Sequence, residues 1–334
     1  MILITGGTGL VGAHLLLQLA DGDIPLRALY RREENIAKTK NLFTYYDRAH
    51  LFENIEWIQG DIVDVPSLED AFKGVTHVYH CAALVSFDPN DEDKLRKVNI
   101  EGTANMVNLS LAYGIAKFCY VSSIAALGDT RVGGQVIDEE TEWNPEKTHG
   151  DYALTKHGAE MEVWRAWQEG LKVVIVNPGI IFGYGFWHQG SSRILQAVRK
   201  EQRFYTNGTS GTVAVEDVVK VIRLLMASEI SGERYTVVAE NMSYRKVLDI
   251  LSDGMSKKRP SIYASPLMTS MAWRLDWLIS KLSLKKRTFT RAMAKSSHTQ
   301  EKFDNSKLAS ALNFQFTDME LYLKNLAEKF ISSL

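Results

Sequence analysis

The 334-residue chain contains little of what marks a secreted or membrane-spanning protein. It has only two cysteines, Cys81 and Cys119, each within or at the end of an apolar run, which indicates buried thiols and no disulfide. A reducing cytoplasm fits this cysteine content. No basic segment with a long apolar stretch precedes the first glycines, so we expect no signal peptide. Residues 265–284 are interrupted by charges, so we also expect no transmembrane helix.

Charge of one sign is equally scarce. The net charge is −1, so we expect neither nucleic acid nor membrane as a partner. The histidines lack metal-ligand spacing, and we predict no metal site. A local exception is a basic cluster beside an aromatic-rich helix, which we interpret as a solvated face because Asp276 accompanies it; contact with an anionic membrane stays open. The cluster comprises Lys281, Lys285, Lys286, Arg287 and Arg291.

The first half of the chain alternates short β-rich runs with helical stretches. This alternation predicts right-handed crossovers and an α/β fold with a Rossmann-type, doubly wound parallel sheet. The expected strands are 1–5, 25–30, 55–59, 76–81, 117–122 and 172–177, and the expected helices are 10–21, 33–51, 67–73, 92–113 and 150–169.

After Pro178 the pattern loosens, and the end of the chain is mainly helical. We therefore expect a dinucleotide-binding domain over residues 1–180 and a smaller, mainly helical substrate-binding lobe over residues 181–334. Elements at about 205–240 are expected to return to the first domain. The glycine- and aromatic-rich loop 183–193 predicts either a lid over the substrate or a packed hydrophobic corner.

A glycine-rich turn lies between the first strand and the first helix, in the run Ile-Leu-Ile-Thr-Gly-Gly-Thr-Gly-Leu-Val-Gly. Gly6 permits a sharp turn, Gly9 lets the backbone approach a pyrophosphate, and Gly12 lets the helix pack on the strand. The helix N-terminus presents N–H groups and a positive dipole end to phosphates. We expect Thr8, Leu10 and Val11 to complete this cofactor contact.

The end of the second strand predicts which dinucleotide binds. An acidic residue at this position selects NAD, whereas arginine accommodates a 2′-phosphate. Arg31 and Arg32 occupy the position, and no acid appears before Glu33. Because guanidinium groups suit phosphate, we predict that Arg31, supported by Arg32, selects NADP(H).

Tyr152 and Lys156 open a predicted helix at a spacing that places them one turn apart on one face. A nearby ammonium and an oxidised nicotinamide both favour a phenolate, so we expect the pKa of Tyr152 to fall from about 10 toward neutrality. Tyr152 then exchanges a proton with the substrate oxygen. Ser122 and Ser123 end an apolar strand where the sheet forms its ligand crevice, and a serine there can stabilise that oxygen.

These motifs resemble the extended branch of the short-chain dehydrogenase/reductase family, also known as the NAD-dependent epimerase/dehydratase family. The resemblance spans about residues 1–220 and begins with Thr5-Gly6-x-x-Gly9-x-x-Gly12. It selects Ser123 over Ser122 as the catalytic serine and implies that Lys156 holds the nicotinamide ribose. One departure is Asn177, which stands where the family usually has arginine.

The resemblance also implies further cofactor contacts. Asp61 and Ile62 would meet the adenine, and Ala82 and Ala83 would pack against the cofactor. Asn99 would support the active-site backbone. Backbone around Pro178, Ile180 and Ile181 would meet the nicotinamide amide.

The expected function is an NADP(H)-dependent oxidoreductase that interconverts a carbonyl and a secondary alcohol, similar to dihydroflavonol reductases and 3β-hydroxysteroid dehydrogenases. Trp164 and Trp167 on the catalytic helix favour the homodimer that this family often forms, with contact to the C-terminal lobe as the alternative. Two other functions stay open. One is a nucleotide-sugar epimerase with tightly bound NAD, and the other is a non-catalytic NADP-binding regulator, although such regulators usually lose the Tyr/Lys pair.

Overall fold

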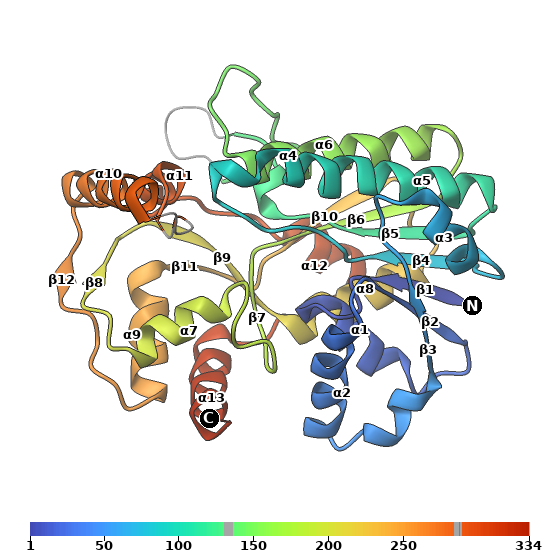
Figure 1. Cartoon of the computed structure of the whole chain (residues 1–334), viewed down its shortest axis with the longest axis horizontal. Helices are drawn as coiled ribbons and strands as arrows, with labels where there is room; N and C mark the ends of the chain where they lie inside the picture. The colour runs from blue at the N-terminus through green and yellow to red at the C-terminus, as the bar shows by residue number, and fades with distance from the viewer. Residues whose placement is uncertain (130–135, 284–286, 288, 334) are drawn as a thin grey trace.

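The computed structural model describes residues 1–129, 136–283, 287 and 289–333 (Figure 1). Lys285 and Lys286 of the basic cluster lie outside the described residues. Cys119 is buried, Cys81 is partly buried, and both are free thiols, as predicted.

A seven-stranded sheet forms the centre of the fold, in the order β10-β6-β5-β4-β1-β2-β3, and every neighbouring pair is parallel. Its strands carry near-continuous apolar runs because both faces are covered by helices. The predicted Rossmann-type fold class is confirmed. The strands are β1 (Ile2–Thr5), β2 (Leu26–Tyr30), β3 (Ile55–Gln59), β4 (His77–His80), β5 (Lys117–Val121), β6 (Val173–Pro178) and β10 (Glu233–Val237).

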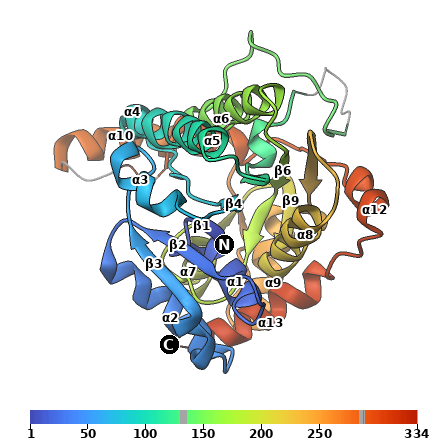
Figure 2. The same cartoon turned by 90° about the vertical axis from the view of Figure 1, so that its right-hand side faces the viewer.

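Helices cover both faces of the sheet, and each face has its own buried core (Figure 2). One face packs against α1 (Leu10–Leu19), α2 (Ile36–Tyr45) and α8 (Val215–Ala227). The opposite face packs against α3 (Val65–Phe72), α5 (Gly102–Ala112) and α6 (Asp151–Gln168).

Two expected helices are interrupted. The helix expected over 33–51 divides into a 3-10 turn (Glu33–Asn35), α2 and a second 3-10 segment (Ala49–Asn54). Asp47 lies between the last two with a φ of 55°, a left-handed conformation that a right-handed helix cannot continue through. The helix expected over 92–113 contains α4 (Glu92–Leu95), a π-helical segment (Arg96–Glu101) and α5.

The remaining elements gather on the left of Figure 1 around a third core. A small sheet of β7 (Ile180–Phe182), β9 (Thr209–Ala214) and β11 (Glu240–Ser243) packs with α7 (Ser192–Arg199), α9 (Tyr244–Gly254) and α13 (Met319–Ser332). Beyond them lie β8 (Phe204–Tyr205), β12 (Ile262–Tyr263), α10 (Pro266–Ser283) and α11 (Arg291–Ser296). The short α12 (Ser306–Leu312) returns to contact β10.

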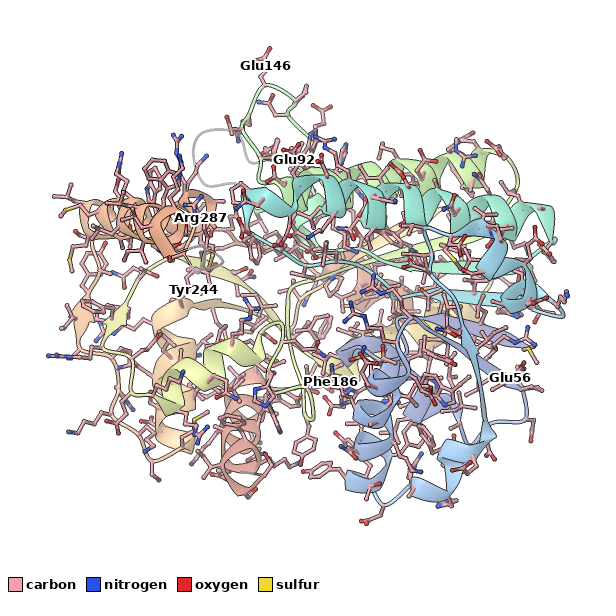
Figure 3. All side chains as sticks on the ribbon, viewed as in Figure 1. Glu56, Glu92, Glu146, Phe186, Tyr244 and Arg287 are labelled. Atoms are coloured by element: carbon pink, nitrogen blue, oxygen red, sulfur yellow. The ribbon has the colours of Figure 1, made fainter. Side chains whose placement is uncertain are left out.

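The segment after Pro178 does not stay in one part of the molecule. Helix α8 packs on the seven-stranded sheet and β10 is one of its strands, and both lie within the range in which we expected a return. In the loop 183–193, Phe186 is buried in a core (Figure 3). Tyr184 of the same loop stacks on Tyr45 with ring centroids 3.4 Å apart. This packing favours a hydrophobic corner over a lid. Across the described residues, no helix has both the length and the apolar character needed to span a membrane.

Candidate active site

The glycine turn packs so closely that two of its glycines are required by the protein itself. Gly6 has a φ of 71°, and a Cβ on it would lie 2.7 Å from the backbone nitrogen of Ala82. A Cβ on Gly12 would lie 2.3 Å from the carbonyl oxygen of Gly6. The start of α1 therefore lies so close to the end of β1 that neither position has room for a side chain, as the turn requires.

Gly9 differs from these two glycines. It is the N-cap of α1, and a Cβ on it would meet only the Gly6 oxygen, at 3.3 Å. Packing of the protein therefore does not exclude a side chain at Gly9. The partly buried Thr8, Leu10 and Val11 surround the same helix end. An open backbone surface beside unpaired helix N–H groups fits a pyrophosphate.

This contrast predicts separable effects for two alanine substitutions. Gly9→Ala should weaken dinucleotide binding by about tenfold or more, equivalent to about 1.4 kcal/mol or more, because its methyl group fills space needed by the ligand. Its thermal stability should stay near wild type. Gly12→Ala should lower the melting temperature, because its Cβ meets backbone. Calorimetric titration and thermal unfolding check both; unchanged affinity in Gly9→Ala would contradict the assignment of this turn.

The ends of β2 and β3 bring Arg31 and Asp61 together. The Arg31 Nη1 lies 3.8 Å from the Asp61 Oδ2, and the Arg31 side chain is 62% exposed. Such an exposed pair contributes at most about 1 kcal/mol, so the guanidinium can turn to another anion. Arg32 is also exposed. Ile62 is buried and packs under Gly102, which leaves the Asp61–Ile62 backbone at the sheet edge.

Ser123 and Tyr152 meet at the carboxyl end of β5. The Ser123 hydroxyl is near enough to Tyr152 to act in the direction that lowers its pKa, and the Ser123 Oγ accepts from the Ala125 amide at 3.1 Å. Ser123 is half-buried, whereas Ser122 is buried. The structure therefore brings together the serine and tyrosine that the resemblance selected.

The pKa of Tyr152 does not follow the sequence-based expectation. Burial raises it to about 12, and the nearby Ser123 hydroxyl only partly opposes this. Desolvation of the phenolate is thus the largest effect, and the expectation of a lowered pKa is wrong for the protein alone. A positively charged oxidised nicotinamide would act in the lowering direction when bound.

Lys156 lies one helical turn from Tyr152 but makes its own hydrogen bonds elsewhere. Its Nζ donates to the Val121 carbonyl oxygen at 2.8 Å and to the Tyr120 hydroxyl at 3.2 Å. Burial lowers the pKa of Lys156 to about 8. The last residues of β5 therefore position the ammonium, and Ser123 follows two residues after the strand ends.

A buried polar chain, which the motifs did not reveal, continues from Lys156 to the glycine turn. The Tyr120 ring stacks on His80 with centroids 5.6 Å apart, and the His80 Nε2 lies 3.1 Å from the Thr103 Oγ1. The His80 Nδ1 lies 2.7 Å from the Thr5 Oγ1, which accepts from the Ala82 amide at 3.2 Å. Burial lowers the pKa of His80 to about 3, so this histidine is a neutral structural link.

Asn99 connects the catalytic helix to the segment after β4. Its amide exchanges hydrogen bonds with the backbone of Leu84, at 2.8 and 3.0 Å, and donates to the Thr155 Oγ1 at 3.0 Å. This segment includes Ala82 and Ala83. Asn99 is thus placed to support the active-site backbone, in the manner the resemblance implied.

Asn177 performs a positioning role despite its departure from the family pattern. Its amide donates to the Ser123 carbonyl oxygen at 3.0 Å and to the Glu160 Oε1 at 2.6 Å. The other Glu160 oxygen pairs with Arg234 of β10 at 3.2 Å. An arginine from the neighbouring strand therefore neutralises this buried carboxylate, and the sequence motifs did not point to it.

The backbone after β6 closes the site toward the glycine turn. Pro178 is buried, and Ile180 and Ile181 are half-buried in β7. A Cβ on Gly183 would lie 3.0 Å from the Leu10 side chain, so this strand runs close to the start of α1. Among the described residues, no group of three or more His, Cys, Asp or Glu could hold a metal ion.

Comparison with known proteins finds similarity over most of the chain. Residues 2–238 match the family model described as the NAD dependent epimerase/dehydratase family. Sterol demethylase protein B of Methylococcus capsulatus is 32% identical over 277 residues, covering 82% of this chain and 80% of that protein. A putative dihydroflavonol 4-reductase of Synechocystis is 32% identical over 257 residues, covering 75% and 71%.

Solved structures share the whole fold. The crystal structure of gox2253 superimposes with a TM-score of 0.81 at 27% identity, covering 100% of this chain and 98% of that chain. A UDP-glucose 4-epimerase of Thermotoga maritima superimposes with a TM-score of 0.77 at 19% identity, covering 99% of both chains. The second similarity concerns the fold alone.

Proposed function

Because the chain belongs to the NAD-dependent epimerase/dehydratase family, we propose that it is an NADP(H)-dependent oxidoreductase that interconverts a carbonyl and a secondary alcohol. The observation that carries this proposal is that Ser123, Tyr152 and the buried Lys156 gather at the end of β5, where the Lys156 Nζ donates to the Val121 carbonyl oxygen. The dihydroflavonol 4-reductase name of a 32% identical relative supports a reductase. A non-catalytic regulator is less well supported, because the complete Ser/Tyr/Lys set is assembled.

Each catalytic side chain has a separate task in this proposal. When bound, the nicotinamide would supply or accept the hydride at the substrate carbon. Tyr152 would donate its phenolic proton to the carbonyl oxygen during reduction and accept a proton from the alcohol during oxidation. Ser123 would donate a hydrogen bond to the same oxygen as its charge develops. Lys156 would bind the nicotinamide ribose through its buried ammonium.

Two apolar side chains indicate the kind of substrate. Phe87 lies 5.9 Å from Tyr152, measured between ring centroids, and is exposed, as is Val85. An exposed aromatic ring beside the proton donor, with another exposed apolar side chain two positions away in sequence, favours a substrate with an apolar or aromatic body around its carbonyl. A screen of aromatic and alicyclic ketones and aldehydes, followed through NADPH absorbance, tests the proposal; turnover of none would leave it unsupported.

The epimerase alternative makes a different prediction about the cofactor. An epimerase retains its NAD and returns the hydride to the same substrate, so it consumes no external cofactor. The fold similarity to UDP-glucose 4-epimerase is consistent with this alternative. Denaturing the purified protein and identifying any released nucleotide separates the two: stoichiometric NAD would favour the epimerase, and exchangeable NADP(H) would favour the oxidoreductase.

The preference for NADP(H) predicts a selective effect of Arg31. Arg31→Ala should weaken NADPH binding by about 10- to 100-fold, the value of a charge-assisted hydrogen bond to phosphate, and leave NADH binding nearly unchanged. Arg48→Ala removes another exposed guanidinium, paired with Asp21, and serves as the control. Calorimetric titration with both nucleotides at one salt concentration checks this; a wild type that binds NADH equally well would contradict it.

We also propose that residues 181–334 supply most of the substrate pocket while residues 1–180 hold the dinucleotide.

The homodimer stays a proposal as well. Met161 and Trp167 on α6 are exposed, although Trp167 also packs against Gly232, whose Cβ would lie 2.5 Å from its ring. Sedimentation velocity of wild type and Met161→Glu measures whether this helix face holds two chains together.

A further inference from the structure

Helix α10 (Pro266–Ser283) is oriented opposite to an ordinary surface helix. Thr269 is buried, and Ser270, Trp273, Asp276 and Ser280 are half-buried, so a largely polar side faces the protein. The opposite side is apolar and exposed. A helix on a globular protein normally buries its apolar stripe and exposes its polar face. The arrangement of α10 therefore requires an explanation outside the chain's own core.

The exposed side of α10 is a continuous apolar stripe. Leu267 is 72% exposed and Leu282 is 79% exposed, although leucine is among the most commonly buried residue types. The stripe residues recur every three or four positions, and their flanking neighbours widen the surface. The apolar stripe consists of Leu267, Met268, Met271, Leu275, Leu278, Ile279 and Leu282.

Basic side chains border this apolar stripe. Arg274 and Lys281 are exposed on α10 and lie over the rings of Trp273 and Trp277, at 4.6 and 4.5 Å from the centroids. The adjacent helix α11 adds the exposed Arg291 and Lys295. These are the four basic border residues: Arg274, Lys281, Arg291 and Lys295.

Acidic charge does not balance this border. Among the described residues 266–283, 287 and 289–296, Asp276 is the one acid, and its Oδ2 lies 3.8 Å from the Arg287 Nε. Figure 3 shows Arg287 at the side of the α10–α11 pair that faces the rest of the molecule. The outward surface is therefore apolar with a positive border, on a chain whose net charge is −1.

We propose that α10 lies on the surface of an anionic lipid bilayer, with its apolar stripe in the boundary between headgroups and acyl chains. An apolar stripe bordered by Lys, Arg and Trp is the pattern of a helix that lies in the membrane plane. Long basic side chains place their stems over apolar surface and their charged ends among anionic headgroups. Each basic side chain near such a surface strengthens binding by about fivefold.

The position of α11 connects this surface to the candidate active site. The Ala292 Cβ lies 3.9 Å from the Cβ position of Gly150, the N-cap of the catalytic helix α6. Docking of α10 and α11 on a bilayer would therefore hold the start of α6, where Tyr152 lies, close to the lipid. This link rests on the proposed function, whereas docking itself does not.

A second copy of the chain fits this surface less well. Two apposed stripes would bring their own positive borders together, and the single acid on α10 already lies beside Arg287. Like charges at close range oppose such a contact. A bilayer with anionic headgroups matches both the apolar stripe and its border.

Vesicle flotation with the full chain tests the proposal. Vesicles of phosphatidylcholine mixed with phosphatidylglycerol should bind the protein, and vesicles of phosphatidylcholine alone should bind it much less. Leu278→Asp with Leu282→Asp should reduce binding by at least about tenfold for each leucine. Arg274→Gln with Lys281→Gln should reduce it by about 20- to 30-fold.

Matched controls remove the same groups elsewhere. Leu321→Asp alters a leucine on α13 that is 60% exposed, and Arg199→Gln with Lys200→Gln removes two exposed charges at the end of α7. Both controls should bind vesicles like wild type, and dinucleotide binding reports that every variant is folded.

Three results would overturn the proposal. The first is a wild type that floats with neither kind of vesicle. The second is binding that persists in both α10 variants. The third is a wild type that binds no vesicles and sediments as a dimer, while the leucine variant sediments as a monomer. That result would assign the apolar stripe to contact with a second copy of the chain. None of these measurements depends on turnover, so failure of the proposed enzyme function would be distinguishable.

Discussion

Tyr152→Phe should lose about 10²–10⁴-fold in turnover, because positioned proton transfer contributes that much. The substitution removes one oxygen and leaves a ring of the same shape, so α6 should keep its packing. Ser123 keeps its bond to the Ala125 amide, which limits any change in the loop after β5. Dinucleotide affinity should stay within about twofold of wild type, since Tyr152 acts on the substrate oxygen.

Tyr79→Phe is the matched control for this variant. Tyr79 is also buried, but it lies on β4 within the core on the α1 and α8 face of the sheet. Its turnover should match wild type. Ser123→Ala should lose about 10²–10³-fold, as expected for one oxyanion donor, and the double variant should lose far less than the product of the two losses. Near-normal turnover in Tyr152→Phe, on a substrate that wild type converts, would rule out the mechanism.

The fold could be predicted from local patterns because each element of the sheet carries its own signal. Apolar runs mark the buried parallel strands, and the glycine turn marks the β1–α1 junction. Helix continuity was harder to predict. Nothing in the local apolar pattern shows that Asp47 adopts a left-handed conformation, which divides the helix expected over 33–51. Such interruptions depend on how the chain re-enters β3.

The candidate site was predictable where one motif contains the whole arrangement. Tyr152 and Lys156 share a helix face, and their spacing alone brings them together. The buried polar contacts around these residues join distant parts of the chain instead. Arg234 reaches Glu160 across 74 positions, and His80 reaches Thr5 across 75. Arg234, His80 and Thr5 are ordinary strand residues in sequence, and only the order of strands in the sheet reveals their roles.

Burial determines two further properties that could not be predicted from residue type, the pKa of Tyr152 and the orientation of α10. The pKa of Tyr152 is raised because its surroundings exclude water, and no spacing rule measures that desolvation. The apolar residues of α10 resemble core residues in sequence, yet their side of the helix faces outward. The net charge predicted no membrane partner, but it averages over the chain and misses a local positive border.

Lys156→Met should abolish most turnover and at the same time stabilise the cofactor-free protein. Burial lowers the pKa of Lys156 from its ordinary 10.5 to about 8, so the folded state holds a charge in an unfavourable place. The corresponding penalty at pH 7 is on the order of 3 kcal/mol. Loss of the hydrogen bonds to Val121 and Tyr120 offsets part of it. We expect a net gain of about 1–2 kcal/mol in the free energy of unfolding.

The pH dependence identifies the source of that gain. Below pH 8 both the folded and the unfolded wild type hold the proton on Lys156, and the penalty is fully present. Between about pH 8 and 10.5 the unfolded state binds more protons than the folded state, so wild-type stability rises with pH. The advantage of Lys156→Met should therefore shrink through this window. Urea unfolding at several pH values measures it.

Lys117→Met provides the opposite case in the same sheet. The Nζ of Lys117 is also buried, but it donates to the Leu225 and Ser228 carbonyl oxygens at the end of α8, each at 2.6 Å. Removing it leaves these helix-terminal carbonyls without their donor, so stability should fall while turnover per folded molecule stays near wild type. A stabilised, inactive Lys156→Met beside a destabilised, active Lys117→Met would show that the catalytic lysine is kept at the expense of stability. Destabilisation of both would instead assign Lys156 a structural role.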